Sequence, residues 1–329
     1  MATIKDVAKY AGVSISTVSI ILNGKAQDRK ISLDTQEKVA NAIKSLNYQP
    51  NLSAKKLRSS SERKTIALFW TTDFREVMLA RFLNGLHKQI NKLGLNFDIV
   101  IYTYQNDELY KETELQGSSS FHGAIIANAS TKDLQFLKSF IPLIPIVLYN
   151  READNYSSVI VNDKKIGEIA ANLCLQFQQI ALVKAPYVFN GMKIRDNAFI
   201  AHVSSNIKIY NVNDQNIADG FQIAKDIDFK NIDVLFVPSN NIAYGIMHYC
   251  YLNNISIPDD LSLICVGNGL PEYDNYSNPA LTVIEVPMEN MAALCLEILT
   301  QLFYNSNVVK KVIEPNLIIR NSFKMLMED

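Results

Sequence analysis

Short apolar runs alternate with amphipathic segments from residue 64 onward, and this alternation limits the fold more than any other feature. IALFW, FDIVIY, GAIIAN and IPIVLY are separated by helical segments such as 82–93 and 134–140. SSVIVN, QIALVK, IKIYNV, DVLFVP and LSLICVG repeat the pattern in the second half. Strands that alternate with helices form βαβ units around a parallel sheet. Two α/β lobes of about 100 to 130 residues each are therefore expected.

The first 23 residues show a different pattern, with two short helices joined by a glycine turn. Gly12 can adopt the positive φ that ends a helix, and Ser14 can cap the next one. The spacing predicts one buried face in the first helix, made by Ile4, Val7, Ala8 and Ala11. In the second helix, the same spacing predicts that Val18, Ile21 and Leu22 are buried. The residues expected to be exposed are Ile15, Ser16, Thr17, Ser19 and Ile20. Such a face can approach base edges in a DNA major groove, although an ordinary helical hairpin has the same signature.

The charges are divided unevenly along the chain. Residues 1–64 hold 12 Lys or Arg against 5 Asp or Glu, a formal net charge of +7. The remaining residues hold 20 basic and 28 acidic groups, a net charge of −8. A basic run alone is often a solvated face, but beside a helix-turn-helix pattern it predicts binding to DNA phosphates.

A third helix and a basic segment follow. Ser32 can cap the third helix, whose apolar stripe comprises Val39, Ala42, Ile43 and Leu46. Pro50 ends this helix, and residues 51–58 have the length of one or two further turns. A helix that short is marginal without a partner, so the segment either folds when it docks on DNA or remains a flexible linker.

TIKDVAKYAGVSISTVSIILNG, LNYQPN and SAKKLRSS, in this order and spacing, resemble the LacI/GalR family of bacterial transcription regulators, and the resemblance extends over the whole chain. It implies an all-α helix-turn-helix head joined to a two-lobed α/β body that is periplasmic-binding-protein-like, with parallel sheets. The implied boundaries are a DNA-binding domain at 1–50, a hinge helix and linker at 51–63, and an effector-binding and dimerisation body at 64–329. Three crossovers divide the body into a first lobe of about 64–159 plus 288–313 and a second of about 160–286 plus 315–329.

The resemblance also implies DNA contacts. In the family, the hinge-helix Leu of each subunit wedges into the minor groove at the operator centre, and Leu57 occupies this place in AKKL. Packing of Leu57 within a linker is the alternative. Many members carry a long polar residue, often Arg, where this chain has Ile20, so contact with a thymine methyl group is expected here. The candidate DNA contacts are Thr3, Ile15, Ser16, Thr17, Ser19, Ile20, Asn23, Asn51, Lys55, Lys56 and Leu57.

An effector is expected in the crevice between the lobes, at the carboxyl ends of strands. Arg195 matches the Arg that commonly contacts the effector in the family. The candidate contacts are Phe74, Arg75, Asn150, Arg195, Ser239, Asn240 and Asn268, each of which could instead be a loop polar group or a helix cap. Gly269 stands where the family has an Asp that binds sugar hydroxyls. A simple sugar is thereby disfavoured against an effector that carries its own negative charge, or no small effector.

The expected partners are double-stranded palindromic operator DNA, a small-molecule effector (a sugar, a sugar phosphate or another metabolite) and a second copy of the chain. A homodimer is expected because one short recognition helix reads few bases and palindromic half-sites match a two-fold axis. The four histidines are scattered, and no nucleophile-elbow, phosphate-loop or metal-spacing pattern occurs, so neither enzyme activity nor a metal or cofactor is expected.

The sequence has no signal peptide and no run of 18 apolar residues, which predicts a cytoplasmic protein without a membrane partner. The four cysteines lie in apolar stretches and are expected to be buried free thiols. The favoured function is a sequence-specific transcriptional repressor whose operator binding is modulated by a small molecule. The alternatives are a regulator that responds to a partner protein or to no ligand, and, in another class, a solute-binding protein.

Overall fold

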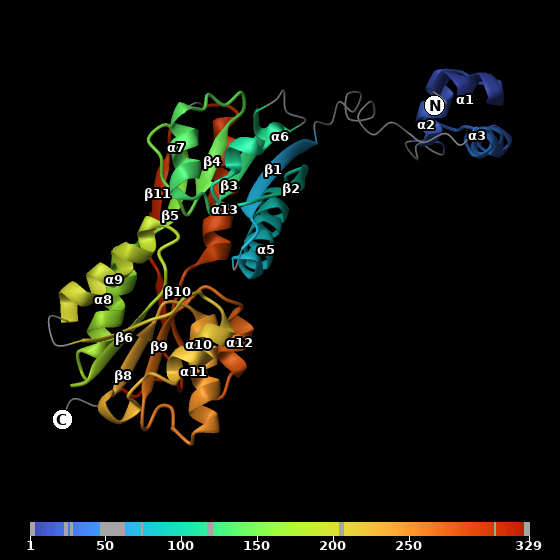
Figure 1. Ribbon diagram of the computed structural model, residues 1–329. Coiled ribbons are helices and arrows are strands. Elements are labelled where there is room, and N and C mark those ends of the chain that lie inside the picture. Colours follow the sequence, from blue (N-terminus) through green and yellow to red (C-terminus); the bar gives the residue numbers. More distant parts are fainter. Residues whose placement is uncertain are drawn as a thin grey trace. The chain divides into compact units, whose positions relative to one another are not determined.

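The computed structural model describes residues 4–22, 26, 29–46, 63–73, 75–116, 121–203, 207–305 and 307–325 (Figure 1). The chain forms two compact units, Met1–Arg63 and Lys64–Asp329. We call the first unit the head and the second the body. Each is described separately below.

In the described part of the head, the helices are α1 (Ile4–Ala11), α2 (Ile15–Leu22) and α3 (Leu33–Ser45). Gly12 ends α1 with a φ of +66°, and the Oγ atom of Ser14 accepts a hydrogen bond from the backbone N–H of Thr17 at 3.1 Å. Ser32 receives the equivalent bond from Thr35 at 3.3 Å. The glycine turn and both predicted caps are therefore confirmed. The small core of the head comprises Val7, Ala8, Val18, Val39 and Ala42, with Ala11, Val13, Ile21, Ile43 and Leu46 packed against it.

The first lobe of the body is built on a parallel sheet with strand order β11-β5-β4-β3-β1-β2. Its strands are β1 (Lys64–Thr71), β2 (Phe97–Tyr104), β3 (Gly123–Ala127), β4 (Ile146–Tyr149), β5 (Ser157–Val161) and β11 (Lys310–Ile313). Its helices are α5 (Glu76–Leu93), η1 (Leu109–Lys111), α6 (Thr113–Gln116), α7 (Thr131–Ser139) and α13 (Met288–Leu302).

The second lobe is built on a sheet with strand order β12-β10-β9-β8-β6-β7. Helices α8 and α9 lie on one side of this sheet, and α10, α11 and α12 lie on the other (Figure 1). The strands are β6 (Ile180–Lys184), β7 (Lys208–Asn211), β8 (Val234–Val237), β9 (Ser262–Gly267), β10 (Thr282–Glu285) and β12 (Asn316–Ile318). The helices are α8 (Asp163–Cys174), α9 (Asn190–Val203), α10 (Ile217–Ala224), η2 (Phe229–Asn231), α11 (Asn240–Leu252) and α12 (Pro271–Tyr276).

The predicted fold class, a helical head and two parallel-sheet α/β lobes, is confirmed, with two local departures. The run SSVIVN was grouped with the second half of the pattern, and the first lobe was expected to end near residue 159, inside this run; instead Ser157–Val161 of the run forms β5 of the first sheet, between β4 and β11. An apolar strand has the same sequence pattern whichever parallel sheet it joins, so its partners had to come from the structure. Strand β12 runs antiparallel to β10, as an edge strand of an otherwise parallel sheet.

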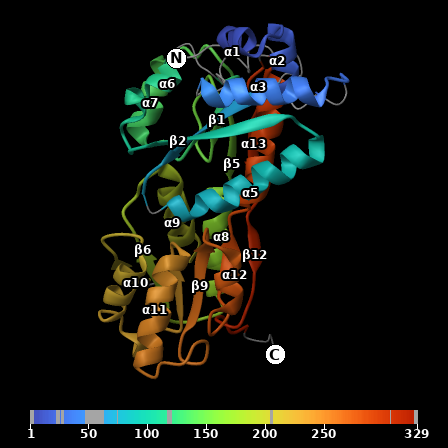
Figure 2. The ribbon, with the colours of Figure 1, turned by 90° about the vertical axis from the view of Figure 1, so that its right-hand side faces the viewer.

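The two lobes share their largest hydrophobic core cluster. It includes Trp70 and Tyr149 of the first lobe and Phe236 and Val266 of the second, and Met288 joins them from the crossover between β10 and α13. The chain also crosses between the sheets after β5 and between β11 and β12. Helices α5 and α13 pack against each other at Gly85, where a Cβ atom would lie 2.4 Å from the carbonyl oxygen of Glu289 (Figure 2).

All four cysteines are buried free thiols, as predicted. In the part of the chain that the structure describes, no helix has the length and apolar character needed to cross a membrane. The same residues contain no group of His, Cys, Asp and Glu side chains that could hold a metal ion.

Candidate functional site

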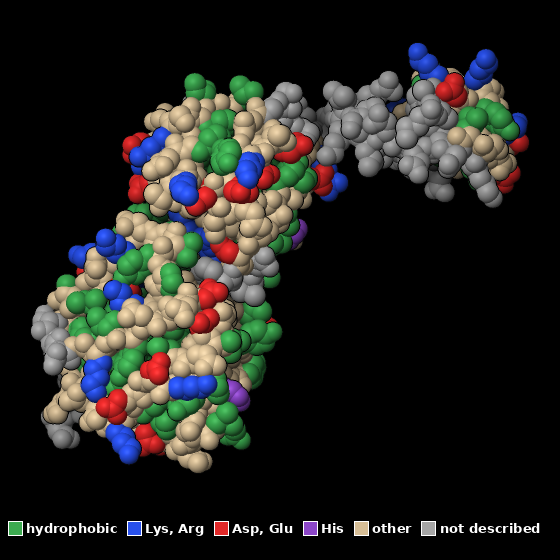
Figure 3. Space-filling model, viewed as in Figure 1, with side chains coloured by type: hydrophobic (Ala, Val, Ile, Leu, Met, Phe, Trp, Pro, Cys, Tyr) green, Lys and Arg blue, Asp and Glu red, His purple; other side chains and the backbone are tan. Residues whose placement is uncertain are grey.

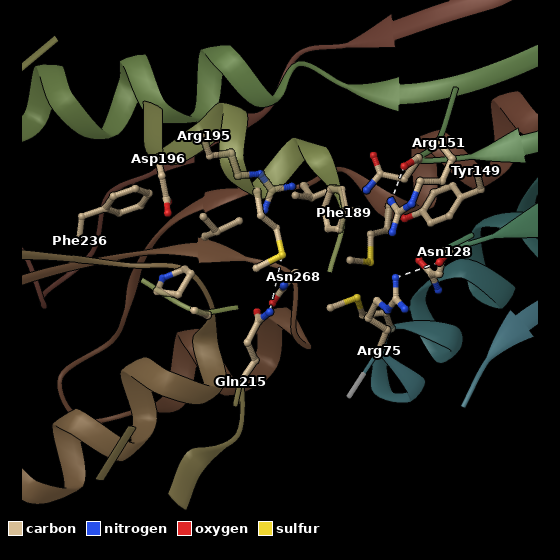
Figure 4. A pocket seen from close by; sticks show the side chains of 18 residues that line it. Arg75, Asn128, Tyr149, Arg151, Phe189, Arg195, Asp196, Gln215, Phe236 and Asn268 are labelled. Atoms are coloured by element: carbon tan, nitrogen blue, oxygen red, sulfur yellow. Dashed lines mark hydrogen bonds between the residues drawn. The ribbon is translucent and has the colours of Figure 1, made fainter. Parts of the chain in front are cut away.

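A pocket lies between the two lobes of the body, with about 710 Å³ of empty space that includes open solvent (Figure 4). Side chains at the carboxyl ends of parallel strands form its walls: Asn128 follows β3, Asn150 and Arg151 follow β4, and Asn268 follows β9. The carboxyl edges of parallel sheets are where open α/β folds bind ligands. We call this space the interlobe pocket.

Arg75 lines the pocket from the start of α5, and its guanidinium group is held by neighbours in the first lobe. The Nε atom donates to both carboxylate oxygens of Asp73 at 2.9 and 3.0 Å, and Nη1 donates to the carbonyl oxygen of Asn128 at 3.0 Å. Nη2 donates to Asp73 and to the amide oxygen of Asn106. Burial would raise the pKa of Asp73, but the hydrogen bonds and the charge of Arg75 outweigh this effect and lower it. The charge of Arg75 is thus matched within its own lobe.

Arg195 lines the pocket from α9 in the second lobe, and it is also paired. Its Nε atom donates to the carboxylate of Asp163, the first residue of α8, at 2.6 Å. Helices α8 and α9 approach closely at Gly167, where a Cβ atom would lie 2.2 Å from the carbonyl oxygen of Arg195. The close packing of the two helices therefore fixes the position of Arg195 and its carboxylate partner.

Arg151 lines the pocket from the first lobe and was missing from the sequence-based candidates. Its Nε atom donates to the carbonyl oxygen of Ala129 at 2.6 Å, and Nη1 donates to that of Asn150 at 2.5 Å. The guanidinium carbon lies 3.9 Å from the ring centroid of Phe189, which belongs to the second lobe. The only signal for this residue was a basic side chain two residues after the end of a buried strand.

Asn128 and Asn150 occupy equivalent places at the ends of the neighbouring strands β3 and β4. Both have positive φ angles, 63° and 53°, a conformation that Asn tolerates better than most other residues. The amide nitrogen of Asn128 is buried and has no hydrogen-bond partner in the part of the chain that the structure describes. The two asparagines thus bring amide groups to the wall of the pocket, one of them with an unused donor.

Asp196 is the one carboxylate among the described residues that line the pocket. It accepts a hydrogen bond from the hydroxyl group of Tyr187 at 2.9 Å. Burial raises its pKa, an effect that the Tyr187 hydrogen bond and nearby cations only partly offset. Because Asp196 belongs to α9, it faces the pocket from the second lobe.

The structure brings four of the seven sequence-predicted effector residues together in the pocket: Arg75, Asn150, Arg195 and Asn268. Ser239 and Asn240 do not line it. Ser239 caps α11 by accepting from the N–H of Ile242 at 3.5 Å, and Asn240 accepts from the N–H groups of Asn268 and Gly269, both at 2.8 Å. Asn240 thus shapes the loop that carries Asn268, and effector contact by either residue stays a prediction. Phe74 lies outside the described residues.

The predicted DNA-reading face lies on α2. Val18 is fully buried, while Ile15 is 39% exposed. Ser16 is exposed, and Thr17, Ser19 and Ile20 are partly exposed. Lys and Arg side chains project from the described part of the head (Figure 3). The other candidate DNA contacts lie outside the described residues: Thr3, Asn23, Asn51, Lys55, Lys56 and Leu57.

Comparison with known proteins adds to this geometry. Residues 3–51 match the bacterial regulatory proteins of the lacI family, and residues 173–323 match the periplasmic binding protein-like domain. The crystal structure of a LacI family transcription regulator from Clostridium acetobutylicum has a TM-score of 0.74 and 32% identity, over 79% of this chain and 100% of that one. The chain belongs to the LacI family.

Other members of the LacI family match over nearly the full length. The chain is 27% identical to the probable HTH-type transcriptional repressor ExuR of Bacillus subtilis, over 99% of both proteins. The lac repressor dimer, solved with operator and the anti-inducer ONPF, shares the fold with a TM-score of 0.73 at 21% identity, over 98% of each chain. The LacI-family chain described here is a DNA-binding transcriptional regulator.

Proposed function

We propose that this regulator represses transcription by binding a palindromic operator as a homodimer, and that a small molecule in the interlobe pocket changes its affinity for the operator. The observation that carries the proposal is the composition of the pocket wall. Arg151 and Asn128 come from one lobe and Arg195 and Gln215 from the other, so one ligand can contact both. A ligand that binds one arrangement of the lobes more tightly shifts the population toward it.

A buried ion-pair cluster gives such a shift a route out of the pocket. Arg81 of α5 donates to the carboxylates of Glu285 and Glu289, and its Nη1 atom donates to the carbonyl oxygen of Gly269 at 3.1 Å. Gly269 follows Asn268 in the second lobe, whereas α5 belongs to the first. Movement of the Asn268 loop is therefore transmitted to α5, which begins directly after Arg75.

DNA recognition is assigned to the exposed face of α2 together with Leu57. We expect Ile20→Ala to weaken operator binding about tenfold by removing an apolar base contact, and to leave binding to unrelated DNA unchanged. The operator is first selected from random duplexes with the full-length protein, and affinity is then measured by fluorescence anisotropy. Tyr251→Ala, which changes a side chain of α11 that is 77% exposed, is the matched control.

Four further measurements decide the proposal. Affinity should fall steeply with salt, because phosphate contacts release counterions. Leu57→Ala should weaken binding to the operator without unfolding the head, as followed by circular dichroism. A monomer in sedimentation at the concentrations that saturate the operator would contradict the dimer. Operator affinity that responds to no small molecule, but to a purified protein from the source cells, would favour the partner-protein alternative.

A further inference from the structure

Arg151 differs from the other two arginines of the interlobe pocket in having no carboxylate partner. Arg75 is paired with Asp73 and Arg195 with Asp163, but none of the ion pairs among the described residues includes Arg151. Its Nη2 atom is buried and makes no hydrogen bond with any described residue. The residue is only 5% exposed, so bulk water does not solvate the charge. One buried cation of the pocket is therefore left unmatched.

An unmatched buried cation is expensive, because desolvation penalises the charged form. Burial does lower the pKa of Arg151, and the charge of nearby Arg75 lowers it further. A guanidinium group nevertheless keeps its proton at neutral pH. The cost is therefore not removed by deprotonation, and a bound anion would remove it.

A second unused donor lies on the same wall. The amide nitrogen of Asn128 is buried without a partner at the end of β3, the strand beside the one that precedes Arg151. Figure 4 shows Asn128, Tyr149 and Arg151 on the same side of the pocket. Native proteins leave few buried donors unpaired, and two of them in one pocket indicate the place of an acceptor group on a ligand.

Because Arg151 is the single unmatched cation of the pocket among the described residues, the acceptor group is expected to carry one negative charge. A carboxylate carries one negative charge and two coplanar oxygens, which suits one free guanidinium edge. A phosphate group carries up to two negative charges and three oxygens, so Arg151 alone would leave it undercompensated. Asp196 lies in the second lobe and hydrogen bonds to Tyr187, so it does not neutralise Arg151.

We propose that the effector of this regulator is a small organic acid whose carboxylate binds Arg151 and Asn128 on the first-lobe wall of the interlobe pocket. The inference rests on the proposed function in one respect, that the interlobe pocket is the effector site. Phe189 packs on the face of the Arg151 guanidinium, which leaves its edge for the carboxylate. The remainder of the acid would face the second lobe.

The test uses the smallest carboxylate, so that its result does not depend on the identity of the effector. Full-length protein is titrated with acetate, with its uncharged analogue acetamide and with inorganic phosphate, at constant ionic strength. The single tryptophan, Trp70, reports binding by fluorescence, because its ring lies 6.0 Å from that of Tyr149, which lines the pocket. Thermal unfolding gives a second readout, since a ligand of the folded state raises Tm.

Acetate should bind, acetamide should bind at least about tenfold more weakly, and Arg151→Gln should abolish that preference. Lys164→Gln removes the same formal charge from a side chain that is 73% exposed, and it should behave as the wild type. Equal responses of wild type and Arg151→Gln to acetate would overturn the proposal. If phosphate binds more tightly than acetate, and this binding depends on Arg151, the ligand group is a phosphate and the carboxylate proposal is wrong.

Failure of this inference can be told apart from failure of the proposed function. If acetate binds through Arg151 but pocket ligands leave operator affinity unchanged, the carboxylate site stands and effector control is wrong. If an uncharged compound alters operator affinity equally in the wild type and in Arg151→Gln, effector control stands and the proposal of a carboxylate effector is wrong.

Discussion

At the residue scale, the interlobe pocket combines charges that are matched inside the protein with one that is not. The pairs Arg75–Asp73 and Arg195–Asp163 orient their guanidinium groups without any ligand. Such groups are preorganised, so a ligand that contacts them does not have to order them. Arg151 is also held by two carbonyl oxygens, but its charge has no partner among the described side chains. The pocket is thus rigid at all three arginines and electrostatically incomplete at one.

The Asp73–Arg75 pair should make stability depend on pH. The pKa of Asp73 is lower in the folded protein than in the unfolded chain, so the pair stabilises the fold above the unfolded pKa. This contribution is lost as the pH falls through the lowered folded-state pKa. Asp73→Asn should lower the free energy of unfolding at pH 7 by roughly 1–3 kcal/mol and flatten the acid side of the pH profile. Urea unfolding between pH 3 and 7 measures both effects, and a profile parallel to that of the wild type would exclude this role.

At the element scale, the α5–α13 contact depends on a residue without a side chain. A Cβ atom at Gly85 would meet the carbonyl oxygen of Glu289 at 2.4 Å and its Cα atom at 2.7 Å. Both are backbone atoms, so no rotamer change relieves the clash. The helices could accept a larger residue only by moving apart, which would open the core beneath them.

We expect Gly85→Ala to lower the free energy of unfolding by about 3 kcal/mol, since the helices must separate. Gly94→Ala is the matched control, because Gly94 has open space around it and only its φ of +61° resists a side chain. Gly94→Ala should lower the free energy of unfolding by about 1 kcal/mol. Chemical unfolding of the full chain compares the two variants, and similar losses would show that the helix contact adapts without cost.

Prediction from sequence also succeeded mainly at the element scale. The alternation of apolar runs and helices predicted both sheets. The apolar residues spaced three and four apart predicted the core of the head. Both patterns are local in the sequence. The edge strand that pairs with β5, β11, follows the whole second lobe along the chain, so this pairing could not be read locally. Arg151 was missed because its burial and its unused donor depend on neighbours distant in sequence, such as Ala129 of the first lobe and Phe189 of the second.

At the scale of the whole molecule, the two lobes are joined by packing as well as by the three crossovers. Their largest core cluster is shared, and Arg81, only 4% exposed, connects α5 to the second lobe. The charge and hydrogen bonds of Arg81 lower the pKa of Glu289, although burial alone would raise it. The lobes should therefore change their relative position as packed bodies, with Arg81 at the contact between them.

Arg81→Gln should lower the free energy of unfolding at pH 7 by about 3 kcal/mol, because it leaves two partly buried carboxylates without their cation. The loss should shrink as the pH falls and Glu289 becomes protonated, since the lowered pKa of Glu289 stabilises the fold only at higher pH. In the same variant, any effect of pocket ligands on operator affinity should weaken. An unchanged ligand response, measured by anisotropy, would place the coupling route elsewhere.

The order of the strands has a consequence for synthesis of the chain. The first sheet lacks its edge strand until residue 313 has been made, and the second lacks its edge strand until residue 318. In the head, by contrast, the three helices that the structure describes are complete after residue 45. Domains fold from the N-terminus as they leave the ribosome, so the head can fold long before either lobe is complete. A prematurely terminated chain would therefore keep α2, the helix proposed to read DNA, without the lobes that are proposed to control it.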